Sequence, residues 1–304
     1  MARVGLEVPV FGPSAAKRAV YLGASCVELN AAGSYAAGGL TPSLADLECV
    51  ADLDVPLRIM IRPRGPPSRE RDFIYHKEEF LQMARDIHQF KKSGLLREER
   101  GDGFVFGILK EAISTHLQDK PIETASNFGN VQQRKHTQLG QQEASTHTPR
   151  CWVDVERCTH LVKACRPFKA VFHRAFDEIV SSSEDSTVLS EHNSWDKALD
   201  DLSVCGFNAI LTSGGLGKAI QNVTTLRSII RKAEELGIEI IIGGGVRKTN
   251  IGELVERLEL GTEDHRTIVH SACLSGDSGE EVDEDEVQGI VTHLQSSPTK
   301  SAVD

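Results

Sequence analysis

The sequence predicts an α/β protein of the TIM (β/α)8 barrel class, folded as a single domain. Eight short apolar runs suited to buried strands recur along the chain, and helical sequence follows each of the first seven. Several of these runs end in polar residues. A chain of 304 residues could hold two average domains, but a barrel of about 250 residues counts as one. This alternation favours a closed barrel over an open doubly wound sheet, with the polar strand ends gathered at its carboxyl face.

The first part of the chain gives four strands and three helices. Ser14 suits the cap of the first helix and Gly23 its end, while Thr41 and Pro42 suit the start of the second. A stiff loop that carries three arginines, Arg62, Arg64 and Arg69, follows the third strand. We expect strands at 4–10, 26–30, 56–61 and 103–107, and helices at 14–22, 41–53 and 77–92.

The second part of the chain is interrupted by polar sequence. From 111 to 150 the apolar periodicity disappears, so we expect a long, mobile polar insertion between strands four and five. A shorter polar insertion spans 181–190. We expect strands at 169–173, 208–213, 238–242 and 267–270, and helices at 153–165, 195–205, 218–236 and 250–260. The barrel then spans 1–274, and 275–304 forms an acidic, disordered tail.

Charge and composition exclude several classes of protein. The net charge is −10, but seven acidic residues lie between 276 and 286, and without them the rest of the chain is near −3. With no basic stripe and few aromatics, nucleic-acid binding has little support. The chain shows no apolar run of about 18 residues and no charged-then-apolar leader, so we expect no membrane contact and a cytoplasmic location.

The seven cysteines do not indicate a disulfide framework or a thiolate zinc site, because they are irregularly spaced and form no C-x-x-C pair. Cys151, Cys158 and Cys165 recur every seven residues. In a helix they would share one face, too far apart to chelate a single ion. We interpret them as small buried hydrophobic residues.

Period-two alternation along the strands predicts which polar side chains point into the barrel. Arginines offer forked donors for a carboxylate or phosphate, and a glycine run after strand seven lies where such barrels often bind phosphate. The expected inward set is Glu7, Glu28, Asn30, Arg62, His173, Thr212 and His270, with Arg64 and Asp177 on the loops just above and Gly243 to Gly245 after strand seven.

Two chemical interpretations of this set remain open. In the first, an enzyme acts on a small anionic or phosphorylated substrate. Its catalytic candidates are Glu28, His173 and Asp177, and its ligand-binding candidates are Arg62, Arg64, Thr212, Gly243, Gly244 and His270. In the second, a divalent metal is bound by Glu7, Glu28, His173 and His270, whose N/O donors suit Zn²⁺ or Mn²⁺ better than soft Cu(I).

Structural roles compete with both interpretations. Glu28 and Arg62 could form a buried ion pair, and His270 could be a hydrogen-bonded core residue. The glycines at 243–245 could only make a tight turn, and Thr212 could cap a helix.

Several segments together resemble the CutC copper-homeostasis family. Two of them are specific as a pair, Met60-Ile-Arg-Pro-Arg-Gly65 and Phe172-His-Arg-Ala-Phe-Asp177, and others include Gly38-Gly-Leu-Thr-Pro-Ser43 and Gly243-Gly-Gly-Val246. They run in family order from residue 4 to about 274, leaving out the insertion and the tail. The resemblance implies a TIM barrel, cytosolic copper handling and copper binding, in a family whose molecular activity is unsettled.

The chain departs from the family at two cysteine positions. The family commonly has a cysteine at the end of the first strand and another directly after the Glu-Leu of the second, where this chain has Pro9 and Asn30. Cys26 and Met60 are the remaining candidate soft ligands. The retained arginine, histidine and carboxylate set therefore fits a polar ligand better than a thiolate metal site.

Three function classes follow: a copper-homeostasis protein, an enzyme for a small anionic substrate, and an interaction protein whose insertion and tail recruit partners. The sequence leaves open whether copper or another divalent metal is bound, whether the chain is an enzyme, and whether it forms a homo-oligomer.

Overall fold

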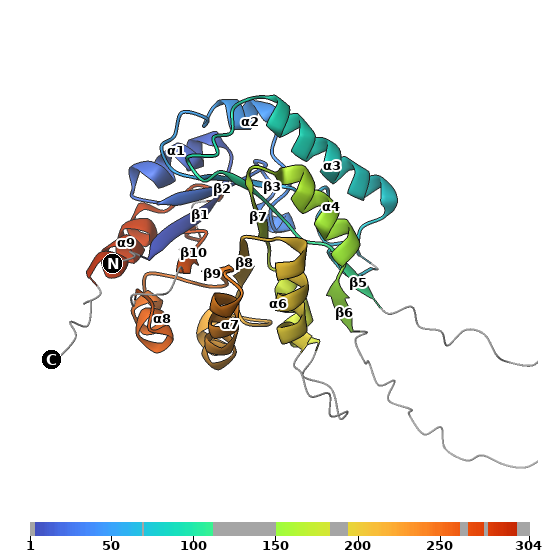
Figure 1. Cartoon of the computed structure of the whole chain (residues 1–304). Helices are drawn as coiled ribbons and strands as arrows, with labels where there is room; N and C mark the ends of the chain where they lie inside the picture. Colours follow the sequence, from blue (N-terminus) through green and yellow to red (C-terminus); the bar gives the residue numbers. More distant parts are fainter. Residues whose placement is uncertain are drawn as a thin grey trace, which may run out of the picture.

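The structure, a computed structural model, describes residues 4–68, 70–111, 150–182, 194–261, 267–276 and 279–296. Eight parallel strands close into a barrel, and helices surround it (Figure 1). The TIM barrel predicted from the sequence is confirmed. Most of the expected polar insertion, residues 112–149, lies outside the described residues.

The first half of the barrel follows the predicted order, with one helix shorter than expected. Ser43, not Thr41, caps the second helix, because its hydroxyl accepts the Asp46 N–H in a capping box, while the Thr41 hydroxyl accepts the Arg62 N–H. The elements are β1 (Gly5–Phe11), α1 (Pro13–Tyr21), β2 (Cys26–Asn30), η1 (Tyr35–Ala37), α2 (Leu44–Glu48), β3 (Leu57–Met60), α3 (Lys77–Lys92) and β4 (Gly103–Phe106).

Next in the chain comes a feature that the sequence did not predict. The short strands β5 (Leu109–Glu111) and β6 (Cys151–Val153) pair antiparallel, at the two ends of the polar insertion. The following helix, α4 (Val155–Cys165), begins after Asp154, whose carboxylate accepts the Arg157 N–H. The prediction that Cys151 shares a helical face with Cys158 and Cys165 is therefore wrong, since Cys151 lies in a strand.

The second half of the barrel adds one helix directly after the fifth barrel strand, α5, where the sequence suggested a loop. The elements are β7 (Lys169–Phe172), α5 (Ala175–Ser181), α6 (Ser194–Cys205), β8 (Ala209–Thr212), η2 (Ala219–Gln221), α7 (Val223–Glu235), β9 (Glu239–Ile242), α8 (Ile251–Leu258), β10 (Thr267–His270) and α9 (Glu284–Ser296). Around the barrel the strands follow the order β1-β10-β9-β8-β7-β4-β3-β2.

The barrel interior has an apolar side and a charged side. Alternate residues of β3 to β9 form a small apolar cluster, which is separate from the large core between the strands and the helices. The members of the small cluster are Met60, Val105, Val171, Ala209, Leu211 and Ile241. On β1, β2 and the start of β3, buried Glu7, Cys26, Glu28 and Arg58 take their place. The buried charged side chains of the barrel strands thus lie on these three strands.

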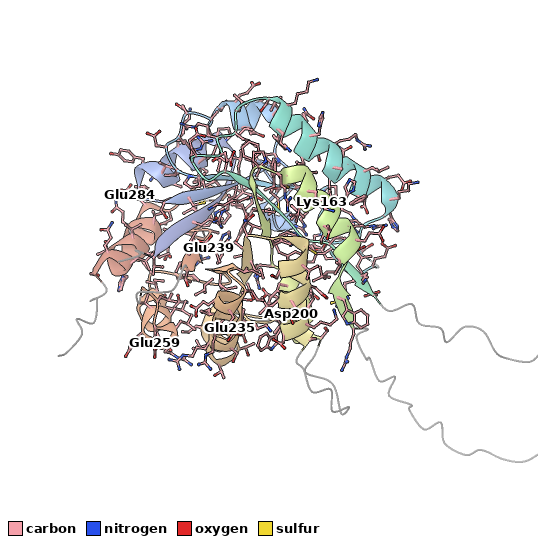
Figure 2. The ribbon with its side chains drawn as sticks, in the orientation of Figure 1. Lys163, Asp200, Glu235, Glu239, Glu259 and Glu284 are labelled. Carbon is pink, nitrogen blue, oxygen red and sulfur yellow. The ribbon has the colours of Figure 1, made fainter. Side chains whose placement is uncertain are left out.

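The end of the chain differs from the expected disordered tail, because 284–296 form helix α9. Val287 and Ile290 on this helix are fully buried, and the Arg18 guanidinium of α1 contacts the Val282 carbonyl and the Glu284 carboxylate. Figure 2 shows Glu284 at the start of α9, close to the first helix. The acidic residues suggested a solvated tail, but three of them, Glu284, Asp285 and Glu286, form the first turn of an amphipathic helix. No helix in the described part of the chain is long and apolar enough to cross a membrane.

Candidate functional site

A cavity of about 550 Å³ opens at the carboxyl ends of the barrel strands. Its wall comes from the loops that follow β2, β3, β7, β9 and β10, so residues far apart in the sequence become neighbours. Arg62 and His173 both contribute to it, as the sequence predicted. The main lining residues are Pro9, Glu28, Tyr35, Met60, Arg62, Asp72, Phe73, His173, Arg174, Gly244, Gly245, Val246, Arg247, His270 and Ser271.

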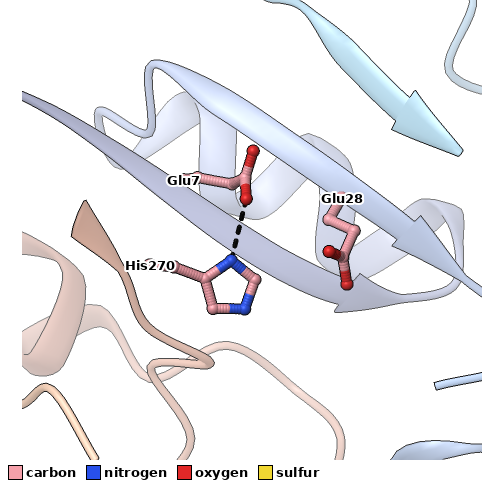
Figure 3. A group of neighbouring side chains, drawn as sticks. All are labelled: Glu7, Glu28 and His270. Atoms are coloured by element: carbon pink, nitrogen blue, oxygen red, sulfur yellow. Dashed lines mark hydrogen bonds and ion pairs between the residues drawn. The ribbon is translucent and has the colours of Figure 1, made fainter. Parts of the chain in front are cut away.

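The floor of the cavity is built by Glu28 and His270, and Glu7, which does not line the cavity, contacts His270 (Figure 3). The parallel register places Glu7 opposite His270 on one side and Cys26 on the other. The His270 Nδ1 lies 2.8 Å from Oε1 of Glu7. One ligand atom from each of Glu7, Glu28 and His270 falls within 4.8 Å of the others. Three of the four predicted metal ligands therefore come together, and the fourth, His173, does not.

Both carboxylate oxygens of Glu7 are bonded to neighbouring side chains. Its Oε2 forms an ion pair of 2.7 Å with Arg58 and accepts a hydrogen bond of 3.1 Å from the Cys26 thiol. Burial raises the pKa of Glu7, but the charge of Arg58 and the hydrogen bond with His270 outweigh this and lower it to about 2. Glu7 is therefore an ionised, fully engaged carboxylate that orients His270 from below.

Glu28 is engaged on one side only. Its Oε1 accepts a hydrogen bond of 3.2 Å from the Asn30 amide, whereas Oε2 is buried and has no hydrogen-bond partner among the described residues. Burial raises the pKa of Glu28. At His270, burial lowers the pKa, but the hydrogen bond with Glu7 and the charges of Glu28 and Glu7 together outweigh it and raise the pKa. A carboxyl and an imidazole that can exchange protons or hold a cation thus share the floor.

His173 contributes a neutral hydrogen-bond donor to the wall. The Ala175 N–H donates to its Nδ1 at 3.2 Å, which assigns the ring proton to Nε2. Burial, and then the charge of Arg62, lower the pKa of His173 to about 3. Nε2 is buried and has no partner in the described part of the chain.

Phe73 holds His173 and Arg62 together in the wall. Its ring centroid is 4.6 Å from that of His173 and 5.2 Å from Cζ of Arg62. Phe73 adopts a φ of 66°, a conformation that is rare for a bulky side chain. This conformation is fixed by hydrogen bonds on both sides, from the Phe73 N–H to the Asp72 carboxylate and from the Leu109 N–H to the Phe73 carbonyl.

The two predicted anion-binding arginines are bonded within the protein. Arg62 lines the cavity, but it pairs with Asp72 at 2.7 Å and donates to the carbonyls of Ala37 and Gly39, so the expected pair with Glu28 does not form. Arg64 is not among the residues that line the cavity. It pairs with Glu79 at 2.6 Å and donates to the Ile74 carbonyl.

Asp177 and Thr212 organise a turn next to the cavity and do not line it. Asp177 Oδ1 accepts from the Thr212 hydroxyl at 2.6 Å and from the Ser213 N–H at 3.0 Å. Its Oδ2 accepts from the Ser213 hydroxyl at 2.8 Å and from Arg174 at 2.7 Å. Gly243 is not among the residues that line the cavity, whereas Gly244 is. A Cβ on Gly243 would lie 2.7 Å from the Leu211 side chain.

Sequence reasoning missed three residues that shape the site. Arg58 pairs with Glu7, and the alternation that places Met60 inward applies to Arg58 as well. Cys26, which the sequence offered as a soft ligand, instead donates a hydrogen bond to Glu7. The loop residues Arg247 and Phe73 line the cavity, but only the folded loops show this. A signal for Arg247 existed in its place directly after the glycine run and Val246.

Comparison with known proteins points to one family. The model of the CutC family matches residues 4–131 and 130–269. The chain is 30% identical over 277 residues to a family protein CutC of Rhizobium meliloti, covering 91% of this chain and 84% of that protein. It is 29% identical over 253 residues to the copper homeostasis protein cutC homolog of Drosophila melanogaster, covering 83% of this chain and 73% of that protein.

A solved structure shares the fold. The crystal structure of CutC from Streptococcus agalactiae superposes with a TM-score of 0.60 at 23% identity, covering 88% of this chain and 98% of that chain. At this identity the likeness concerns the barrel and not the chemistry of the cavity.

Proposed function

This chain belongs to the CutC family, and from that premise we propose that it takes part in copper homeostasis by binding a divalent metal ion, copper included, on the floor of its cavity. The observation that carries the proposal is the buried Oε2 of Glu28, which has no partner among the described residues and lies in the same cluster as His270. The proposal includes a cytoplasmic location.

The arrangement around His270 supports a metal ligand. Histidines that bind metals usually place their other ring nitrogen against a carboxylate, which fixes the ring and raises its basicity. Glu7 has this relation to Nδ1, which leaves Nε2 of His270 and Oε2 of Glu28 as the donors. In this scheme Glu7 supports the site from beneath, because Arg58 and His270 already engage its oxygens.

The donor types favour Cu(II) or Zn²⁺ over Cu(I). Imidazole and carboxylate suit divalent ions, whereas Cu(I) prefers thiolates and thioethers. Met60 supplies the only sulfur among the described residues that line the cavity. The positions at which the family resemblance implies thiolates carry Pro9, on the cavity wall, and Asn30, which donates to Glu28.

Calorimetric titration of the metal-free protein with Cu²⁺ and with Zn²⁺ tests this proposal. We expect one metal site per chain. We expect Glu28→Gln and His270→Gln each to lower the metal affinity by more than about 100-fold, because loss of a direct ligand should exceed the loss of about 10–100-fold typical of a residue that only supports a ligand. His88→Gln, which changes an exposed histidine of α3, serves as the matched control. Unchanged affinity in both floor variants would reject the site.

Glu28 and His270 also support a second candidate function, that of an enzyme that acts on a small anionic substrate. The pKa of Glu28 and the pKa of His270 are both raised, and neighbouring groups with shifted pKa values are typical of acid–base catalysis. Conversion of a phosphorylated or carboxylated compound by metal-free protein, abolished by Glu28→Gln, would favour this function over metal binding.

A further inference from the structure

We infer that the wall formed by the loop after β9 and by His173 is a binding site for an oxyanion, so that the natural ligand of this cavity is a small molecule with a phosphate or carboxylate group. The inference rests on the proposed function, because it concerns the same cavity and names the class of ligand that this cavity binds. It depends on residues separate from Glu28 and His270, so the two can be tested apart.

The first argument is the exposed backbone of the glycine loop. Gly244, Gly245 and Val246 all line the cavity, and Gly244 and Gly245 have φ values of +94° and +69°. A Cβ on Gly244 would lie 2.6 Å from Cβ of Ser213, so the loop requires glycine there. Among the described residues, the N–H groups of Gly244, Gly245 and Val246 have no hydrogen-bond acceptor. Consecutive free N–H groups of this kind are suited to an anion.

The second argument is the charge of Arg247. The hydrogen bonds of its guanidinium within the described part of the chain are long and go to neutral oxygens, at 3.2 Å to the Val246 carbonyl and at 3.4 Å to the Ser271 hydroxyl. The other two arginines of the cavity wall, Arg62 and Arg174, are each paired with a carboxylate at 2.7 Å. Arg247 is therefore the wall arginine whose charge is available to a ligand.

The third argument is the unpartnered donor on His173. The side chain is 4% exposed and lines the cavity, and its Nε2 carries a proton for which the described residues offer no acceptor. A buried donor without an acceptor is costly, and an oxygen of a bound ligand would satisfy it.

Together these groups define the chemistry of the ligand. Backbone N–H groups, a guanidinium and a neutral imidazole N–H all donate, which selects an oxyanion. Of the carboxylates that line the cavity, Asp72 is paired with Arg62 and Glu178 with Arg71, whereas Glu28 on the floor has one oxygen without a partner among the described residues. A cavity of about 550 Å³ accommodates a small metabolite. The ligand thus presents an oxyanion to the wall and a metal-binding or proton-exchanging group to the floor.

The test uses metal-free, full-length protein with inorganic phosphate and with acetate as probes, and chloride at equal ionic strength as the blank. Binding is followed by calorimetry and, for phosphate, by ³¹P line broadening. We expect saturable binding of at least one probe and a loss of about tenfold or more in Arg247→Gln, the result of removing one charge-assisted contact. Arg257→Gln, on the exposed face of α8, is the matched control. Tight phosphate with weak acetate identifies a phosphorylated ligand, and the reverse identifies a carboxylate.

Two outcomes overturn the inference: no saturable binding of either probe, or equal binding by wild type and Arg247→Gln. Melting curves of Arg247→Gln check that the variant is folded. Glu28→Gln separates the two proposals, because it should lose the metal site and keep the oxyanion site. Arg247→Gln should do the opposite.

Discussion

The Nδ1 atom of His270 lies 2.8 Å from Oε1 of Glu7, across the ladder that joins the last barrel strand to the first. The floor of the cavity is therefore assembled by closure of the barrel, from strands at opposite ends of the chain. Arg58 on β3 engages the other oxygen of Glu7, so three strands fix one imidazole. Substitution of Glu7 should therefore change the metal affinity of the site, although Glu7 does not line the cavity.

We expect Glu7→Gln to reduce both stability and metal affinity. Breaking a buried ion pair leaves Arg58 with a weaker partner and costs about 3–5 kcal/mol of the free energy of unfolding. Loss of the carboxylate beneath His270 should weaken metal binding about 10–100-fold. Chemical denaturation and calorimetry measure the two effects.

Glu239→Gln is the matched control for this prediction. Glu239 lies 3.4 Å from Arg58 and its side chain is 22% exposed, so we expect a smaller loss of stability and an intact metal site. Equal effects in the two variants would contradict the role assigned to Glu7.

Asp177→Asn should lower the stability of the protein. Asp177 accepts hydrogen bonds from Thr212 and from both the backbone and the hydroxyl of Ser213, and loss of a buried acceptor costs about 1–3 kcal/mol for each group left unsatisfied. Thermal and chemical denaturation measure the effect. Asp201→Asn, which removes a surface pair with Lys197, should stay within about 1 kcal/mol of wild type. Equal stability of the two variants would show that the turn does not depend on Asp177.

Glu280 links the C-terminal segment by hydrogen bonds to the loop at the mouth of the cavity. Its carboxylate accepts the N–H groups of Gly33 and Tyr35, at 2.6 and 2.8 Å, and Tyr35 lines the cavity. We expect Glu280→Gln to accelerate hydrogen exchange of these two amides and to leave the barrel strands unchanged, because a neutral amide is a weaker acceptor. Glu281→Gln, at the exposed neighbouring residue, is the control. Unaltered exchange at Gly33 and Tyr35 would exclude this role for Glu280.

The stability of the protein should fall on mild acidification because of His173. Burial and the charge of Arg62 lower the pKa of His173 from 6.5 to about 3 in the folded state. Between these two pH values the unfolded chain binds a proton at His173 that the folded chain does not. The contribution of His173 to the free energy of unfolding is therefore fully present above pH of about 6.5 and is lost as the pH falls. The slope for one such group approaches about 1.4 kcal/mol per pH unit.

Denaturation of His173→Gln between pH of about 6.5 and about 5, a window above the ordinary pKa of carboxylates, isolates this effect. The variant cannot titrate at this position, so its stability should depend less on pH than that of wild type. His88→Gln, at an exposed position of α3, serves as the matched control. Parallel slopes for wild type and His173→Gln would contradict the assignment.

Period-two alternation was sufficient to place the floor and part of the wall. Glu28 and His270 lie in regular strands, and His173 directly follows one, so each side chain could be assigned to the interior from the sequence. The same rule extends to Arg58, which shares its side of β3 with Met60.

The loops could not be read in this way, because their side chains have no fixed period. Arg64 follows Arg62 by two residues, yet it forms an ion pair with Glu79 and not with groups of the cavity. The carboxylate of Asp177 accepts hydrogen bonds from the turn after β8 and does not face the cavity. Helix α9 was missed for a different reason. Its acidic first turn suggested a solvated tail, and only packing shows that Val287 and Ile290 cover the barrel.

X-ray absorption at the copper edge of the Cu²⁺-loaded protein tests the metal site most directly. The account predicts a first shell of nitrogen and oxygen with outer-shell scattering from one imidazole, and loss of that imidazole signal in His270→Gln. A first shell dominated by sulfur, or a spectrum unchanged by His270→Gln, would contradict it.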